Sequence, residues 1–217
     1  LLDRHGAVVG VIKFATDITA RKTMAASHAA QIAAIGRSQA VIEFTLEGTV
    51  LAANDNFLAT MGYSRDEVVG KPHAMFCDPA FAASPDYAAF WAGLRAGEFV
   101  SAEFERIGKG GRRIWIQASY NPILDPEGRP TKVIKFATDI TERKRSEAIV
   151  QYLTESLERM ASGDLGGRID QHYSGQYEQL RLAYNKTLER LVEIVTSLRT
   201  TSRTVKTATS ELLSGAN

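Results

Sequence analysis

Residues 133–144 read VIKFATDITERK and residues 11–22 read VIKFATDITARK, so eleven of the twelve positions are identical. The two copies are offset by 122 residues, which is too long for a solenoid unit and suits one small domain with its linker. We therefore interpret residues 1–22 as the C-terminal remnant of a preceding domain of the same kind. A remnant of two strands cannot form a stable sheet alone, so we expect it either to be poorly ordered or to pair with another chain.

The sequence between the two copies predicts one complete domain. Residues 24–37 are rich in alanine and favour a helix, and residues 41–53 have the composition of a β-hairpin. Short helical segments follow up to residue 95. Glycine-containing turns then separate three predicted strands at residues 100–107, 113–122 and 132–140. This order predicts an α+β fold with a five-stranded antiparallel sheet.

Particular residues in this order resemble the PAS sensory domain. The series Asn54-Asp55-Asn56-Phe57, Gly62-Tyr63, Glu67 and Gly70-Lys71 is similar to the N…F…GY…E…GK signature of that family. Asp139-Ile140-Thr141 is similar to the motif that closes PAS domains and opens their output helix. The resemblance implies a PAS sensory domain at residues 23–145, most similar to those of energy-sensing and biofilm-linked chemotaxis receptors.

A sheet that short helices cover on one face can enclose a ligand pocket. The large side chains expected there have two alternative roles, which are contact with a ligand and ordinary core packing. These side chains are Met61, Met75, Phe76, Phe90, Trp91, Trp115 and Tyr120.

The sequence does not identify a cofactor for such a pocket. The pocket either has no cofactor or binds haem or FAD. Asn54 and Trp91 match positions that are associated with flavin in the relatives that this domain resembles. His73 is a candidate ligand for haem iron or another metal, because a neutral imidazole is a good ligand. The competing interpretation is a histidine that caps a short helix or bonds to the backbone. Cys77-Asp78 replaces the Arg-His pair of the flavin-binding relatives, and Cys77 lies near the place of the haem-binding histidine. We therefore expect a colourless protein.

Asp139 and Thr141 are the candidate residues for signal coupling, because they lie where the last strand becomes the following helix. A carboxylate there can pair with a basic residue and fix the direction in which the helix leaves. The alternative is an ordinary acidic residue that the helix dipole favours. Asp17 holds the same position in the first copy.

The rest of the chain predicts two helices, at residues 142–162 and from about 176 to beyond 213, with a glycine-containing connector. Apolar residues of the second helix recur at alternating spacings of three and four, except for two consecutive fours at Leu180, Tyr184 and Leu188, which is typical of a coiled coil with one stutter-like discontinuity. A parallel homodimer is the simplest way to bury them. The layout resembles a HAMP signalling module at residues 146–198, and residues 199–217 resemble the start of a chemoreceptor coiled coil. A plain dimerisation stalk is the alternative.

Composition excludes several classes of function. The net charge is +1 and no basic run is present, which argues against nucleic acid as a partner. No apolar segment is long enough for a membrane span, and the single cysteine fits a reducing, cytoplasmic location. No nucleophile–base pair, phosphate loop or metal spacing predicts an enzyme.

We therefore expect the sensory and signal-transducing fragment of a cytoplasmic PAS-containing chemoreceptor. It would act on a chemotaxis kinase and its coupling protein through a downstream region. The alternative is the sensory half of a histidine kinase or a cyclic-dinucleotide cyclase.

Overall fold

The computed structural model describes residues 1, 4–7, 13 and 15–215. It divides into two compact units, residues 1–141 and residues 142–217, and each is described separately. The strands predicted for the remnant at residues 1–22 fall mainly outside the described residues. Its last four residues belong to helix α1 (Thr19–Ser38), so the first copy of the repeat also runs into a helix.

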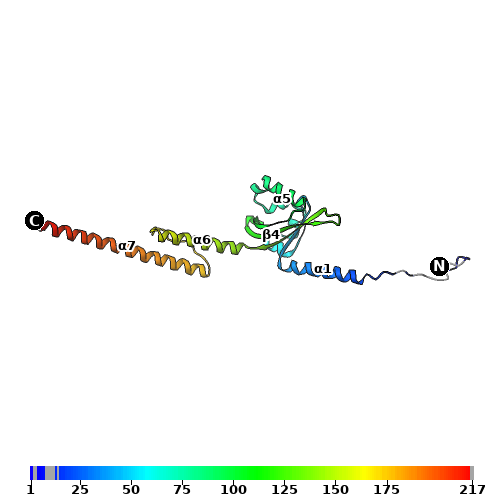
Figure 1. The fold of residues 1–217 in the computed structure, drawn as a ribbon, viewed down its shortest axis with the longest axis horizontal. Coiled ribbons are helices and arrows are strands. Elements are labelled where there is room, and N and C mark those ends of the chain that lie inside the picture. Colours follow the sequence, from blue (N-terminus) through cyan, green and yellow to red (C-terminus); the bar gives the residue numbers. More distant parts are fainter. Residues whose placement is uncertain (2–3, 8–12, 14, 216–217) are drawn as a thin grey trace. The chain divides into compact units, whose positions relative to one another are not determined.

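The first unit is built on an antiparallel sheet of five strands, which confirms the predicted α+β fold (Figure 1). The strand order is β2-β1-β5-β4-β3. The repeated segment forms the central strand β5, which pairs with β1 on one side and β4 on the other. The strands are β1 (Ala40–Phe44), β2 (Val50–Ala53), β3 (Val100–Ile107), β4 (Arg113–Leu124) and β5 (Pro130–Asp139).

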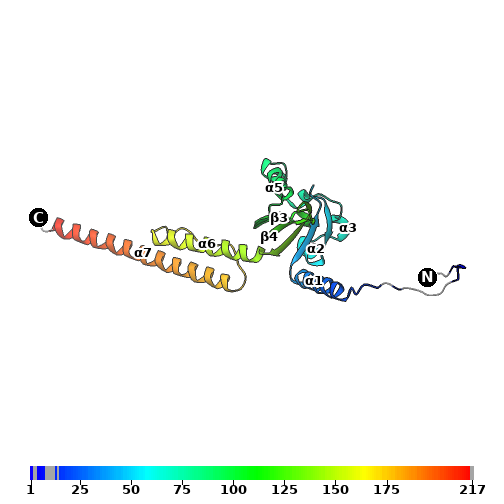
Figure 2. The same ribbon diagram turned by 45° about the vertical axis from the view of Figure 1, so that its right-hand side comes forward.

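Short helices connect β2 to β3 and lie on one face of the sheet (Figure 2). Their starts follow from capping residues in the sequence. The side chain of Asn54 caps the first helix, Ser64 and Glu67 form a capping box, and Ser84 precedes a helix with proline in its first turn. The segments are α2 (Asp55–Met61), α3 (Arg65–Val68), the 3-10 helix η1 (His73–Phe76), α4 (Pro79–Ala82) and α5 (Pro85–Arg95), and a second 3-10 turn η2 (Lys109–Gly111) precedes β4.

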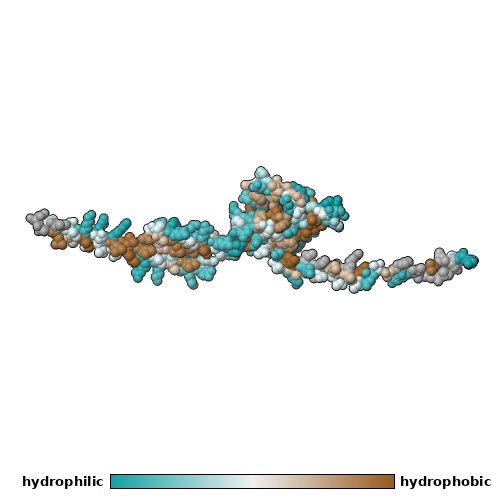
Figure 3. All heavy atoms as spheres, viewed as in Figure 1, coloured by the Kyte–Doolittle hydropathy of each residue, from teal (hydrophilic) through white to brown (hydrophobic). Residues whose placement is uncertain are grey.

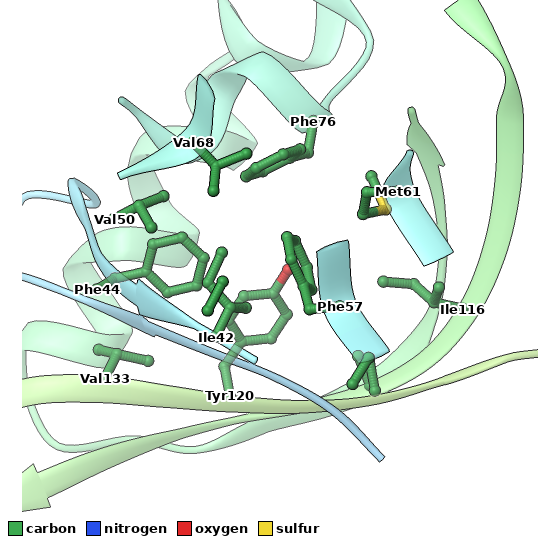
Figure 4. Close-up of a cluster of buried hydrophobic side chains, with 14 of the residues drawn as sticks. Ile42, Phe44, Val50, Phe57, Met61, Val68, Phe76, Ile116, Tyr120 and Val133 are labelled. Carbon is green, nitrogen blue, oxygen red and sulfur yellow. The ribbon is translucent and has the colours of Figure 1, made fainter. Parts of the chain in front are cut away.

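The core lies between this helical layer and the sheet. Alternate residues of the strands point into it, as the period of two in a β-strand requires. Most of them are apolar, and Figure 4 shows Tyr120 pointing from the sheet into the centre of the cluster. Trp115 does not join this core, because it alternates with the buried residues Ile114 and Ile116 and so faces the opposite side of the sheet. The prediction that it lines the pocket is therefore wrong.

The second unit contains helix α7 (Gln176–Gly215) and all of helix α6 (Thr141–Ala161) except its first residue, Thr141, which belongs to the first unit; both helices are close to the predicted ranges. The two helices run parallel and side by side (Figures 1 and 2). The contacts of the connector between α6 and α7 explain how two consecutive helices can run parallel. Gly167 accepts a hydrogen bond from the hydroxyl of Tyr184, and Tyr173 donates its backbone N–H to Glu178 nearer the start of α7. The connector therefore returns along α7 before that helix begins.

A small core holds the second unit together. It consists of the buried residues Leu153, Met160, Ile169, Tyr184 and Leu188. Many other apolar side chains of α6 and α7 remain exposed and form a band along the pair (Figure 3). Among the described helices, none is both long enough and apolar enough to cross a bilayer.

Candidate functional site

The core of the first unit contains an unusual group of polar side chains, which we call the core polar cluster. It consists of His73, Cys77, Tyr87, Arg106, Tyr120 and Lys135. The helical layer contributes the first three, and strands β3, β4 and β5 contribute one each. Tyr120 and Lys135 are cross-strand neighbours, and their side chains meet on the core face of the sheet.

His73 lies at the centre of the cluster and is fully buried. Its Nδ1 lies 3.2 Å from the hydroxyl of Tyr87, and its Nε2 lies 2.9 Å from the hydroxyl of Tyr120. Burial lowers the pKa of His73 well below its usual value, and the positive charges of Lys135 and Arg106 lower it further. His73 is therefore neutral near pH 7.

Tyr120 connects the histidine to the strands. Burial raises the pKa of Tyr120 to about 12, so its hydroxyl stays protonated. The hydroxyl oxygen accepts a hydrogen bond from Nη2 of Arg106 at 3.3 Å. This contact leaves the hydroxyl proton free to bond to Nε2 of His73, which favours the tautomer with its proton on Nδ1.

Two basic side chains of the cluster are buried with no carboxylate partner among the residues that the structure describes. Arg106 and Lys135 are 4% and 1% exposed. Arg106 extends over the ring of Phe104, with its guanidinium carbon 4.5 Å from the ring centre. The Nζ of Lys135 lies 4.8 Å from the centre of the Tyr120 ring and 5.9 Å from that of Phe57. Burial lowers the pKa of Lys135 well below its usual value, and the charge of Arg106 lowers it further.

Trp91 lies against this cluster. Its ring centre is 5.5 Å from that of His73 and 5.8 Å from that of Phe44. A Cβ added to Gly48 would lie 2.8 Å from the Trp91 ring, and the φ of Gly48 is +86°. Glycine is thus required at position 48 both for its backbone conformation and for the close approach of the indole.

Asn54, the third candidate from the sequence, lies outside the core polar cluster and forms hydrogen bonds to the backbone. Its side-chain oxygen accepts hydrogen bonds from the backbone N–H groups of Val41 and Phe57, each at 2.9 Å. Its amide nitrogen donates to the backbone oxygens of Gly36 and Gln39. Asn54 therefore joins the end of α1, the start of β1 and the start of α2. The structure brings together two of the three predicted residues, His73 and Trp91.

This arrangement of side chains does not fit haem or flavin. Both nitrogens of His73 are bonded to tyrosine hydroxyls, and the rings of Phe44, Phe76 and Phe90 also pack around the imidazole. The side chain of Asn54 has its oxygen and its nitrogen occupied by the backbone. Among the described residues, no group of three His, Cys, Asp or Glu side chains could hold a metal ion.

The predicted coupling residues lie at a defined junction. Thr141 donates its backbone N–H to Oδ1 of Asp139 at 2.8 Å. Its hydroxyl oxygen accepts a hydrogen bond from the backbone N–H of Trp115 at 3.0 Å, and the N–H of Ile140 bonds to the carbonyl of Trp115 at 2.8 Å. The start of α6 is therefore fixed to β4, a neighbour of the strand from which α6 emerges.

Sequence reasoning missed Arg106, Lys135 and Tyr87 as site residues. A signal for Lys135 was available, because it alternates with Val133 and Ala137 in the central strand, and all three face the core. A charged residue at an inward position of a central strand indicates a special environment. Arg106 and Tyr87 had no such signal, because both lie in segments of mixed polarity.

Comparisons with known proteins agree with this description. A family model described as PAS fold matches residues 36–145. The chain is 45% identical over 143 residues to the biofilm dispersion protein of Pseudomonas aeruginosa. This alignment covers 66% of this chain and 34% of that protein. It is 28% identical over 99 residues to the aerotaxis receptor of Escherichia coli, covering 46% of this chain and 19% of the receptor.

A solved structure shares the fold. An RNA-binding light-oxygen-voltage receptor aligns with a TM-score of 0.51 at 22% identity, over 70% of this chain and 43% of that one. The chain thus spans about a third of the length of the first relative and about a fifth of the second.

Proposed function

Because the chain belongs to the PAS fold family, we propose that it is the sensory and signal-transducing part of a chemoreceptor-type protein. A signal is received in the PAS core, passes through the junction at Asp139 and Thr141, and changes the state of the helical pair. The PAS domain is homologous to those of the biofilm dispersion protein and the aerotaxis receptor, which supports this class of function.

The direct continuation of β5 into α6 is the observation that carries the proposal. A single residue, Ile140, separates the last residue of the central strand from the first residue of the helix. Lys135, in the core polar cluster, is on that same strand. A shift of the cluster therefore acts on the strand that ends at the helix. Because Thr141 is hydrogen bonded to Trp115, such a shift also strains a fixed contact at the helix start.

The helical pair supplies the second part of the proposal, a HAMP-like module in a parallel homodimer. Two parallel helices with a connector that returns between them have the layout of such a module. Two helices alone cannot bury all of their apolar side chains. Leu157, Leu180 and Leu198 are 52%, 51% and 64% exposed, and a groove between α6 and α7 is lined by Val150, Leu153, Leu157, Leu180 and Ala183.

A second copy is the occupant that fits this band. The exposed apolar residues continue along α7 as Leu198, Val205 and Leu212. Paired with its own symmetry mate, such a series buries itself along its whole length, as in a coiled coil. The output would then be control of a chemotaxis kinase and its coupling protein by the region downstream.

The test uses the full-length protein that carries this chain, reconstituted with a chemotaxis kinase and coupling protein. Thr141→Val removes the hydroxyl contact to Trp115 and preserves the size of the side chain. We expect it to shift kinase autophosphorylation at least threefold, in either direction, without loss of dimer. Thr138→Val is the matched control, because Thr138 is an exposed threonine of β5. An unchanged kinase response in Thr141→Val, with the same stability, would overturn the proposal.

A further inference from the structure

The core polar cluster contains two basic side chains for which packing gives no reason. Arg106 and Lys135 are both more than nine-tenths buried. Neither forms an ion pair with any residue that the structure describes. Burying a basic group without a partner is costly, and apolar residues of similar size would stabilise the same core. A functional reason is therefore needed.

These two side chains have hydrogen-bond donors that the fold does not use. The Nε of Arg106 is buried and has no partner within the described part of the chain. The Nζ of Lys135 faces the rings of Tyr120 and Phe57, where no oxygen atom accepts a hydrogen bond from it. Both side chains converge on Tyr120, because Arg106 donates to its hydroxyl and Lys135 lies over its ring.

We infer that Arg106 and Lys135 form, together with Tyr120, a binding site for an organic carboxylate with an apolar body. The inference rests on the proposed function, because it names the class of signal that the core receives. A carboxylate accepts hydrogen bonds from both basic groups and balances their charge, which no residue in the described part of the fold does.

The side chains around the two basic groups indicate the chemical character of the rest of the ligand. The site is bordered by Phe57, Phe104 and Tyr120, and by Ile42, the cross-strand neighbour of Lys135, and these residues offer no further charge. A phosphate dianion would place a second charge and an entirely polar surface against these apolar side chains, which is costly. A single carboxylate on an aliphatic or aromatic body has one charge and places its apolar part against the aromatic side chains.

Entry of the ligand requires the helical layer to move, because the site is closed in this structure. The layer consists of short segments, of which α3, η1 and α4 have four residues each. Short segments open at lower cost than long helices. The lysine is also present in the repeat, where Lys13 occupies the position of Lys135.

Binding is expected to be coupled to proton uptake. The pKa of Lys135 is lowered because burial and Arg106 both disfavour its charged form. The other titratable groups that face it are His73, Cys77 and Tyr120, and none of them is an anion at neutral pH. The negative charge of a bound carboxylate favours the charged form of Lys135, so Lys135 takes up a proton when the ligand binds.

The experiment measures binding to the whole chain directly, using benzoate, hexanoate and succinate, with benzamide and inorganic phosphate as comparison compounds. We expect benzoate or hexanoate to raise the melting temperature by at least 2 °C at 10 mM. Calorimetry in two buffers of different ionisation enthalpy should show proton uptake. Lys135→Met should abolish the shift, and Arg106→Met should weaken binding at least tenfold. Lys132→Met is the matched control, because Lys132 lies on the same strand and pairs at the surface with Glu43.

Several outcomes would overturn the inference. These are no shift with any of the three carboxylates, an equal shift with benzamide, a shift only with phosphate, or a shift that Lys135→Met retains. Because Lys135→Met removes an unpaired basic group, it is expected to fold at least as stably as the unmodified chain. Kinase output tests the proposed function separately, so failure of one leaves the other standing.

Discussion

The carboxylate oxygen Oδ1 of Asp139 accepts a hydrogen bond from the backbone N–H of Thr141 at 2.8 Å. Asp17 makes the same bond to Thr19 in the first copy of the repeat, also at 2.8 Å. The repeated Asp-Ile-Thr motif therefore has the same local structure twice, as the start of a helix. Both a capping role and a charge-coupling role are compatible with this geometry, and one pair of substitutions separates them.

Asp139→Asn keeps a side-chain oxygen for the bond to Thr141 and removes the charge. We expect its free energy of unfolding to stay within about 0.5 kcal/mol of the unmodified chain, whereas Asp139→Ala should lose about 1 kcal/mol. In the full-length protein, Asp139→Asn should bias kinase activity. Denaturation of the chain and kinase assays measure the two effects. If Asp139→Asn signals normally and only Asp139→Ala is affected, Asp139 is a helix cap and nothing more.

Asn54 is expected to be important for stability in the absence of any cofactor. Asn54→Ala removes two accepted and two donated hydrogen bonds to the backbone, and should cost about 2–3 kcal/mol of unfolding free energy. Asn56→Ala is the matched control. Asn56 only donates to carbonyls near the end of α1, so its loss should cost about 1 kcal/mol. Equal, small effects in urea denaturation would contradict the structural role of Asn54.

His73 should make the stability of the domain depend on pH in mildly acidic solution. The pKa of His73 is lowered in the folded state, so only the unfolded chain takes up this proton as the pH falls below about 6.5. Stability therefore decreases with falling pH until the folded pKa is reached, with a slope of at most about 1.4 kcal/mol per pH unit. His73→Gln should lack this part of the slope in urea denaturation between pH 6.5 and 5.

The control for this measurement is His172→Gln, because the side chain of His172 is exposed and lies in the connector of the second unit. It should leave the slope of the first unit unchanged. A His73→Gln slope that equals that of the unmodified chain would contradict a pKa of His73 that is lowered in the folded domain.

The exposed apolar band of α7 should hold two copies of the chain together. Leu198→Glu combined with Val205→Glu places four charges in the dimer seam and should give monomers in light scattering at 50 μM. The control is Ser197→Glu, because Ser197 lies beside the seam on the same helix. A monomeric unmodified chain, or a dimer that survives both charges, would contradict the homodimer.

The local pattern of the sequence determined much of the fold. The composition of the segments and the glycine-containing turns between them predicted the strands and the short helices, and the repeat predicted where the domain ends. Composition and turn signals depend on neighbours within a few residues, and for that reason they can be read from the chain. The junction at Asp139 and Thr141 was located in the same way.

Tertiary structure alone decided which polar side chains meet. His73, Arg106, Tyr120 and Lys135 come from four different elements, and only the strand order β1-β5-β4-β3 and the position of η1 bring them within contact distance. It also decided that Asn54 binds backbone outside the cluster and that Trp115 faces away from the core. The physical reason is that burial and charge act through space, so the pKa of Lys135 depends on groups that are distant in the sequence.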